Sequence, residues 1–355
     1  MNKDSFRLIA NYRTKRRLVS RTKKNISQLS SARSLSSGQK SEARRFYKEL
    51  LNIDIPTEWH EYFYKRTGIF SPKYIPTSLY YTDIIGKANQ MQFERAYSDK
   101  NITEKLLTGI RQPKTVLRNM NGYFYVNDQA VDRPLAEQVC RNIDDVIIKP
   151  TFQSHGDGVR KFYVKDGVTS IDGKTIGELF DVYGSNFVVQ RVVHQHERMS
   201  ALNPSSVNTL RILTYRSGME VLVLYSVIRI GRQGWDIDNE TAGGISTKID
   251  SNGCLCKYAY GAPGNDMIET TDTGVVLDGY QIPSFGKALD AVKLLHLQLP
   301  YFDLIGWDIC IDVDGEPVLI EWNVWPELSQ SANGPAFGDY TERVLKEIWN
   351  RKNTR

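Results

Sequence analysis

The chain has 355 residues, of which 41% are hydrophobic and 11% aromatic, so it is long enough to bury a globular core in two or three domains. Its longest apolar run, over residues 221–228, has the length of a strand, and no stretch approaches the roughly 18 apolar residues of a membrane-spanning helix. The N-terminus lacks the apolar segment of a signal peptide, so we expect a cytoplasmic protein.

Positive charge is concentrated in residues 1–45. This segment holds 13 lysines and arginines against two acidic residues, Asp4 and Glu42, whereas the net charge of the whole chain is only +5. We interpret residues 1–45 as a basic arm, helical in part, that contacts an anionic membrane surface or a polyanionic glycan rather than nucleic acid. In that case the protein is peripheral at the inner membrane. The alternative is an arm that only keeps the protein in solution.

Residues 46–112 are predicted to form a small N-terminal domain. A helix is expected to begin at residue 46, and three prolines interrupt the aromatic-rich stretch that follows. Residues 101–110 carry apolar side chains at helical spacing, which predicts an amphipathic helix.

A buried strand is predicted over residues 145–150, and it ends in Lys149 followed by proline. Burying an amine without a partner is costly, so Lys149 is expected to meet an anion. The short turn after this strand contains Ser154, Gly156 and Gly158. Glycine lets backbone N–H groups approach phosphate oxygens, and a serine adds a hydroxyl donor, which favours a phosphate-binding loop. An ordinary hairpin turn also fits these residues.

The last part of the chain contains the pattern that is most informative about function. Its predicted elements are strands around Arg211 and Leu222, a helix over residues 286–297, a hairpin over residues 305–324 and a closing helix over residues 341–351.

The turn signal within the hairpin predicts how its two strands pair. Asp-Gly at positions 314 and 315 separates two strand-like runs, which is the signal for a two-residue turn. In that register Asp308 lies opposite Glu321, and Gly306 lies opposite Asn323, all on one face. The other face, with Trp and Ile side chains at 307, 309, 311, 320 and 322 and Val at 318, is expected to meet the core.

Two directly opposed carboxylates repel each other, so a positive charge is expected between Asp308 and Glu321. Together with the amide of Asn323 they form a set of hard oxygen ligands, which suits Mg²⁺ or Mn²⁺ with phosphate oxygens and water completing the shell. The alternative is a solvated polar face on an ordinary hairpin.

The order of these motifs resembles the ATP-grasp superfamily, from about Tyr74 onward. The matching segments are the strand that ends at Lys149, the Gly-containing turn, residues 187–193, residues 208–211, and the ending formed by Asp308, Glu321 and Asn323. More narrowly, the chain resembles the sugar-transfer-associated and teichuronopeptide-synthesis-like ATP-grasp proteins of bacterial polysaccharide loci. The resemblance implies an α+β fold in which two α+β subdomains, over residues 113–200 and 201–355, clamp a nucleotide.

The resemblance also implies roles for individual residues. It makes Asp308, Glu321 and Asn323 the Mg²⁺ ligands, and it makes Lys100 and Lys149 contacts to the phosphates of ATP. The strand that contacts adenine corresponds to Gln190, Val192 and Val193, where Gln190 replaces the usual acidic residue. The ribose contact falls on either His196 or Glu197.

Arg211 is the leading candidate for catalysis. It lies within an otherwise apolar predicted strand, so its guanidinium should pair with a carboxylate or a phosphate. The resemblance places it beside the γ-phosphate, where a fixed positive charge offsets the charge that develops during phosphoryl transfer. A structural salt bridge is the alternative. Arg229, on the strand that precedes a Gly-Gly segment, is a secondary candidate.

The implied function is that of an ATP-dependent ligase, which activates a carboxylate as an acyl phosphate and joins it to an amine. The resemblance favours a uronic acid or an amino acid as substrate, in polysaccharide or capsule biosynthesis. Two alternatives stay open, namely an ATP-dependent kinase on the same fold and a non-catalytic module that binds a nucleotide or a glycan.

Overall fold

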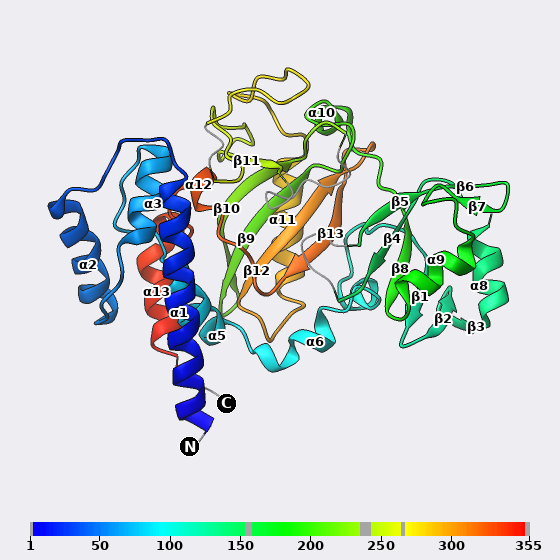
Figure 1. Cartoon of the computed structure of the whole chain (residues 1–355), viewed down its shortest axis with the longest axis horizontal. Coiled ribbons are helices and arrows are strands. Elements are labelled where there is room, and N and C mark those ends of the chain that lie inside the picture. The colour runs from blue at the N-terminus through cyan, green and yellow to red at the C-terminus, as the bar shows by residue number, and fades with distance from the viewer. Residues whose placement is uncertain (1–2, 142, 153–157, 235–242, 264–266, 352–355) are drawn as a thin grey trace.

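A computed structural model of the chain describes residues 3–141, 143–152, 158–234, 243–263 and 267–351, and the side chains from residue 12 onward. Two antiparallel sheets and a group of helices lie in a row, with the five-stranded sheet in the middle (Figure 1). The helices and sheets together form an α+β fold, as predicted. No helix in these ranges is long and apolar enough to cross a membrane.

The six-stranded sheet has the order β3-β2-β1-β8-β4-β5. Two helices, α8 (Arg133–Cys140) and α9 (Ile176–Tyr183), pack on it through a core that includes Leu179 and Phe187. Its strands are β1 (Thr115–Met120), β2 (Tyr123–Val126), β3 (Gln129–Val131), β4 (Val146–Pro150), β5 (Arg160–Phe162) and β8 (Phe187–Arg191). The short strands β6 (Val164–Lys165) and β7 (Val168–Thr169) form a separate pair.

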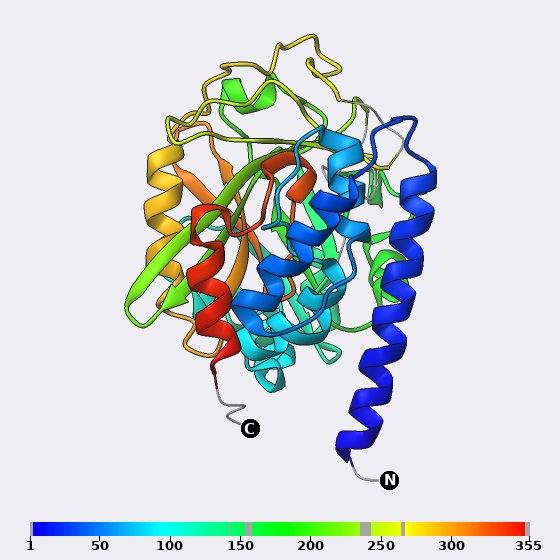
Figure 2. The ribbon, with the colours of Figure 1, turned by 90° about the vertical axis from the view of Figure 1, so that its left-hand side faces the viewer.

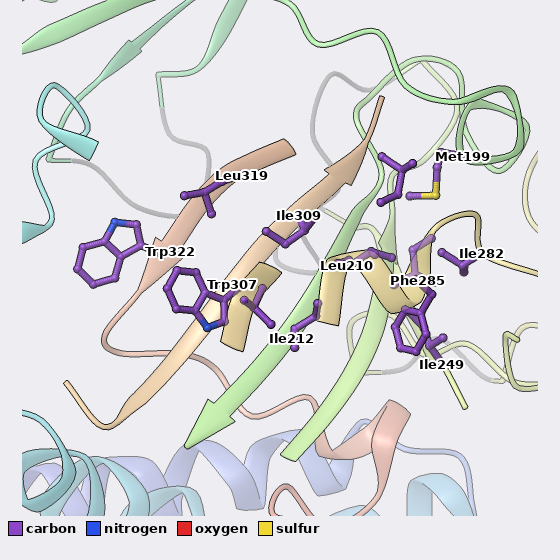
Figure 3. Packing of buried hydrophobic residues seen from close by; sticks show 14 of the residues in the cluster. Met199, Leu210, Ile212, Ile249, Ile282, Phe285, Trp307, Ile309, Leu319 and Trp322 are labelled. Atoms are coloured by element: carbon purple, nitrogen blue, oxygen red, sulfur yellow. The ribbon is translucent and has the colours of Figure 1, made fainter. Parts of the chain in front are cut away.

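The five-stranded sheet has the order β11-β10-β9-β12-β13. Its strands are β9 (Thr209–Ser217), β10 (Glu220–Ile230), β11 (Ile245–Lys248), β12 (Leu304–Ile311) and β13 (Pro317–Asn323). One face packs against α11 (Phe285–His296), which confirms the helix predicted there, and Trp307, Ile212 and Phe285 belong to this core (Figure 3).

The opposite face of this sheet is shared between the helical group and a cavity. Leu213 and Tyr215 on β9 pack with the helices, and Arg211 lies on the same face because side chains alternate along a strand. The helices of this group are α2 (Ser37–Leu51), α3 (Glu58–Thr67), α4 (Thr77–Leu79), the π-helix Tyr80–Ile84, α5 (Ile85–Ala88), α12 (Gln330–Asn333) and α13 (Thr341–Trp349).

The basic arm is largely helical and is partly built into the core. Helix α1 (Lys3–Ser27) contacts α3 and α4, and its side chains Leu18 and Val19 pack on a cluster that contains Trp59 and Phe63. The N-terminal end of α1 extends past the rest of the molecule (Figure 2). The helix expected from residue 46 begins earlier, at Ser37, because Ser36 and Gln39 form a capping box that starts it.

The helix predicted over residues 101–110 is wrong in length. Only α7 (Thr103–Leu106) is helical, between α6 (Glu94–Tyr97) and the strands. After Leu107 the chain bends at Gly109, which has a φ of +83°. Arg111 then pairs with Val318 and accepts a hydrogen bond from the amide of Leu319 (2.9 Å). Pairing with the hairpin therefore prevails over the local helical pattern.

The predicted pairing of the hairpin is confirmed, but the predicted turn is wrong. Asp308 lies opposite Glu321 and Gly306 opposite Asn323. At the turn, however, the amide of Asp312 donates to the carbonyl of Glu316 (3.0 Å), so the loop is longer than two residues. A bulge after Asp308 compensates for the longer loop and restores the register.

The bulge changes which side chains face the core. Leu319 pairs with Ile309 and joins the core of the sheet, whereas Ile320 lines the cavity and Val318 is buried elsewhere. The expectation that Val318 and Ile320 face this core is therefore wrong, since one extra residue reverses the alternation along the strand.

A buried histidine makes the stability of this core sensitive to acid. His296 donates from Nε2 to the carbonyl of Phe302 (3.0 Å) and accepts at Nδ1 from the hydroxyl of Thr214 (2.7 Å). Burial lowers the pKa of His296 to about 3. Below the ordinary pKa of about 6.5, the unfolded chain binds a proton that the folded chain does not, so stability is full above that pH and falls as the pH drops.

We expect the free energy of unfolding to fall by about 1.4 kcal/mol per pH unit from this histidine between roughly pH 6.5 and pH 4. Urea unfolding at several pH values measures it, and His296→Gln should give a shallower dependence. The control is His194→Gln, because His194 is exposed. If the curves of wild type and His296→Gln run parallel, this histidine is not the source of the acid sensitivity.

Candidate active site

A cavity of about 1180 Å³ lies between the two large sheets. Its lining comes from β4 and β8 of one sheet, from β9, β10, β12 and β13 of the other, and from residues 81–100. Among the predicted site residues, the cavity brings together Lys100, Lys149, Gln190, Val193, Arg211, Arg229, Asp308, Glu321 and Asn323. Residues far apart in sequence therefore meet in one place.

Other predicted contacts do not line this cavity. His196 caps the short helix α10 (Glu197–Ser200) by accepting from the amide of Arg198 (3.1 Å), and neither His196 nor Glu197 is in the lining. The amide of Val192 donates to the carbonyl of Asp145 (3.0 Å). Their contacts to the nucleotide stay predictions.

The proposed phosphate loop is only partly described. Ser154 and Gly156 lie outside the described residues. Gly158 has a φ of +73°, a conformation that favours glycine, and its carbonyl accepts from the hydroxyl of Tyr183 (2.6 Å). The neighbouring Val159 lines the cavity.

Asp308 is the centre of a buried ion cluster. Its side chain is only 3% exposed, and Arg211 binds both of its oxygens, from Nε to Oδ1 (2.6 Å) and from Nη2 to Oδ2 (3.0 Å). Arg229 adds a contact from Nη2 to Oδ2 (2.9 Å) and also donates to the hydroxyl of Thr209. The three charged residues come from adjacent strands, since β9 lies between β10 and β12.

The protonation states in this cluster follow from the contacts. Burial alone would raise the pKa of the Asp308 carboxyl, but Arg211 and Arg229 hold that pKa below its ordinary value. Burial opposes the charge of Arg211, yet Asp308 raises the pKa of the guanidinium above its ordinary value. The sequence predicts a positive charge between Asp308 and Glu321. In the structure two arginines contact Asp308 from β9 and β10, and Lys100 contacts Glu321. The carboxylate partner expected for Arg211 is Asp308.

Two lysines, Lys100 and Lys149, line the same cavity as Glu321. Lys100 Nζ is 3.2 Å from Glu321 Oε1, and this carboxylate is one third exposed. Burial and, secondly, the charge of Lys100 lower the pKa of Lys149 to about 8, against an opposing effect of Glu321. Two amines whose charges disfavour each other favour the binding of a further anion.

The side chain of Gln190 has a buried hydrogen-bond acceptor without a partner among the described residues. Its Nε2 donates to Thr115 Oγ1 (3.1 Å) and to the carbonyl of Pro113 (3.3 Å). Its Oε1 is buried and has no hydrogen-bond partner among the described residues. A buried carbonyl oxygen without a partner is costly, so this atom suits a ligand that donates an N–H.

The side chains of the cavity can bind a hard cation only if a bound ligand supplies further oxygen atoms to its coordination shell. In the described ranges, no group of three or more His, Cys, Asp or Glu side chains could hold a metal ion. Glu321 and Asn323 both line the cavity, but both oxygens of Asp308 are occupied by arginines. Mg²⁺ commonly binds to one or two carboxylates and completes its shell with phosphate oxygens and water, which this arrangement permits.

Sequence reasoning missed several lining residues. Tyr81, Glu94 and Arg95 come from the region assigned to the N-terminal domain, and Trp325 and Glu327 directly follow β13. No sequence pattern marks the first three residues. The last two could have been found from their position just beyond Asn323.

Comparison with known proteins bears on the fold. The model of the family described as sugar-transfer associated ATP-grasp matches residues 80–346. A search among curated proteins finds no significant match.

Among solved structures, the chain is similar to an L-amino acid ligase from Bacillus licheniformis, at 13% identity and a TM-score of 0.39, covering 72% of this chain and 48% of that one. It is also similar to D-alanine–D-alanine ligase from Bacillus anthracis, at 16% identity and a TM-score of 0.40, covering 71% and 66%. D-cycloserine synthetase matches at 14% identity and a TM-score of 0.42, covering 73% and 72%. The chain thus spans about half to two thirds of the length of the first two proteins.

Proposed function

The chain belongs to the sugar-transfer-associated ATP-grasp family, and from this premise we propose that it is an ATP-dependent ligase that joins a carboxylate to an amine. The observation that carries the proposal is a single cavity that combines two lysines, two arginines and a set of oxygen ligands. The substrates we propose are a uronic acid or amino acid carboxylate and an amine, in polysaccharide or capsule biosynthesis.

The phosphates of ATP fit the lysine side of the cavity. Lys100 and Lys149 would neutralise phosphate charge, and the open Oε1 of Gln190 would accept a hydrogen bond from the adenine amino group. Glu321 and Asn323 would hold Mg²⁺, or Mn²⁺ in its place, and Asp308 would join them by exchanging one arginine contact. When bound, the ion supplies charge stabilisation at the terminal phosphates.

The arginines fit the transfer step. A carboxylate oxygen of the substrate forms a bond to the γ-phosphorus while the bond to ADP breaks, and this yields an acyl phosphate. Arg211 would hold the incoming carboxylate and offset the negative charge that develops, with Arg229 beside it. The amine nitrogen then attacks the acyl carbon, and phosphate and a proton leave as the amide forms.

The test is a pairwise screen of uronates and amino acids with and without ATP, with mass spectrometry to detect a new amide. We expect ADP release that depends on both the acid and the amine. A phosphorylated product that forms without any amine would identify a kinase instead, and nucleotide binding without turnover would identify a non-catalytic module. Lys149→Met should abolish turnover, whereas Lys161→Met should not, because Lys161 is half exposed and paired with Asp145 outside the cavity.

We further propose that the basic arm recruits the ligase to an anionic membrane surface or a polyanionic glycan. The cations Arg13, Arg16, Arg17 and Lys24 on α1 are all exposed. A lipid-linked or polymeric substrate would be held near the inner membrane by such a contact, and each cation near an anionic surface contributes about 1 kcal/mol, weakened by salt.

Replacing these four cations by glutamine should weaken sedimentation with anionic liposomes by about 100-fold or more, with unchanged thermal stability. Deleting residues 1–45 is a poorer test, because it also removes Leu18 and Val19 from a packed cluster. The matched control replaces four exposed lysines of the body, at positions 105, 161, 257 and 293. If the wild-type protein binds neither liposomes nor a polyuronate at low salt, the arm has no recruiting role.

A further inference from the structure

The backbone just after β13 is held rigidly at the cavity wall. The carbonyl of Val324 accepts from the side chain of Asn89 (2.9 Å), that of Pro326 from the hydroxyl of Tyr80 (2.7 Å), and that of Glu327 from the hydroxyl of Tyr225 (2.9 Å). Asn89 and both tyrosines are buried. Three successive buried donors therefore fix a segment that has no regular secondary structure.

Gly306 lets this segment lie close to the sheet. A Cβ atom at Gly306 would lie 2.6 Å from Cβ of Pro326, which is closer than any real contact allows. Val324 and Pro326 are consequently buried, while the alternate residues Trp325 and Glu327 are exposed and line the cavity.

Trp325 and Tyr81 form an aromatic surface in the cavity, whose lining also includes the carboxylate of Glu327. Trp325 is 41% exposed, and its ring lies nearly parallel to that of Tyr81, with an interplanar angle of 27° and centroids 6.3 Å apart. Among the described residues, the carboxylate of Glu327 has no ion-pair partner, and neither has that of Glu94 in the same lining. Two neighbouring rings that face a cavity offer a flat apolar surface on which a ligand can stack.

The two lysines proposed for the nucleotide also line a second, smaller pocket, which Tyr81, Trp325 and Glu327 do not. A small side pocket of about 20 Å³ adjoins Lys100, Lys149, Gln190 and Glu321 together, and its lining includes none of Tyr81, Trp325 and Glu327. The arginines of the Asp308 cluster line the main cavity only. The cavity of about 1180 Å³ is large enough for a second substrate beside a nucleotide.

We propose that Trp325, Tyr81 and Glu327 form the subsite for the amine substrate, and that this substrate is an amino sugar. This proposal rests on the proposed ligase function. The C–H groups on one face of a pyranose ring carry slight positive charge and stack on the electron-rich face of an indole. A protonated amine on the same ring pairs with Glu327, which has no ion-pair partner in the part of the chain that the structure describes. A flat nucleobase would also stack on the aromatic surface, but it carries no positive charge to pair with the carboxylate.

The test uses glucosamine as the probe and saturation-transfer NMR on the full-length protein without nucleotide. We expect Trp325→Ala to lower the affinity for glucosamine at least tenfold, and Trp325→Phe to lower it less, because a smaller ring remains. Glu327→Gln should reduce glucosamine to the affinity of N-acetylglucosamine, which lacks the charged amine. Tyr163→Ala is the control, since Tyr163 is 55% exposed outside the cavity.

Thermal melting shows whether each variant folds. The proposal fails if wild type does not bind glucosamine at millimolar concentration, or if folded Trp325→Ala binds it as wild type does. It also fails if Trp325→Ala loses affinity for adenosine instead. The assay contains no ATP, so it tests the subsite separately from the ligase function. If glucosamine does not bind but the protein forms an amide with another amine, only the subsite is disproved. If glucosamine binds but no ligation is found, only the ligase function is disproved.

Discussion

Asp308→Asn is expected to abolish turnover and to destabilise the fold by about 3 kcal/mol, because removing one partner of a buried ion pair leaves its counterions uncompensated. Asp308 is almost fully buried and its two oxygens contact Arg211 and Arg229, so the neutral amide would leave the buried guanidinium of Arg211 and the partly buried guanidinium of Arg229 without the negative charge of Asp308. The like-charge argument from sequence favours the opposite result, a fold that is unaffected or stabilised. Urea unfolding and ADP release measure the two effects.

Glu321→Gln is the matched comparison on the opposite strand. Its carboxylate is one third exposed and has one lysine partner at 3.2 Å, so its loss should cost no more than about 1 kcal/mol. We expect turnover to be lost in this variant while the fold stays intact. If Asp308→Asn and Glu321→Gln both lower the free energy of unfolding by the same small amount, Asp308 is not the centre of a buried ion cluster. Asp308→Asn combined with Arg229→Met should recover part of the lost stability, because one of the two positive charges beside the neutral amide is then removed.

Arg211→Lys is expected to lower kcat about 100-fold or more while KM for ATP changes by no more than about threefold. Lysine keeps the positive charge, but it cannot make the two parallel contacts by which Arg211 holds Asp308. A guanidinium that acts mainly in the transition state affects kcat rather than ATP binding. Steady-state ADP release with saturating acid and amine measures both constants.

Arg216→Lys is the control for this prediction. Arg216 lies on the same strand β9 and also makes two contacts to one carboxylate, that of Asp303, but it lies outside the cavity. Its replacement should leave kcat unchanged. If Arg211→Lys also keeps its kcat and loses only stability, Arg211 has a structural role as the ion-pair partner of Asp308. Arg229 then becomes the leading candidate for the residue that contacts the transferred phosphoryl group.

Much of the site could be read from sequence because its key residues lie on regular elements with strong local patterns. Asp308, Glu321 and Asn323 face one cavity because alternation along paired strands is a local property. Lys149 at the end of β4 was found because a lysine in an apolar strand is costly without an anion. The predicted pairs Asp308–Glu321 and Gly306–Asn323 are correct although the loop and the bulge were both missed, because the two shifts of one residue cancel beyond the bulge. Between the bulge and the turn the predicted pairs are wrong by one residue.

What the sequence by itself determined is thus the α+β class, the pairing of Asp308 with Glu321 and part of the set of polar residues that meet at the cavity. The tertiary structure alone decided which charges neutralise one another. Arg211 and Asp308 are 97 residues apart, and they pair because β12 inserts beside β9, a strand order that local patterns do not encode. The same holds for Trp325 beside Tyr81 and for the arm packed on Trp59. Strand order and helix docking depend on the summed burial of distant apolar surfaces, which no short stretch of sequence contains.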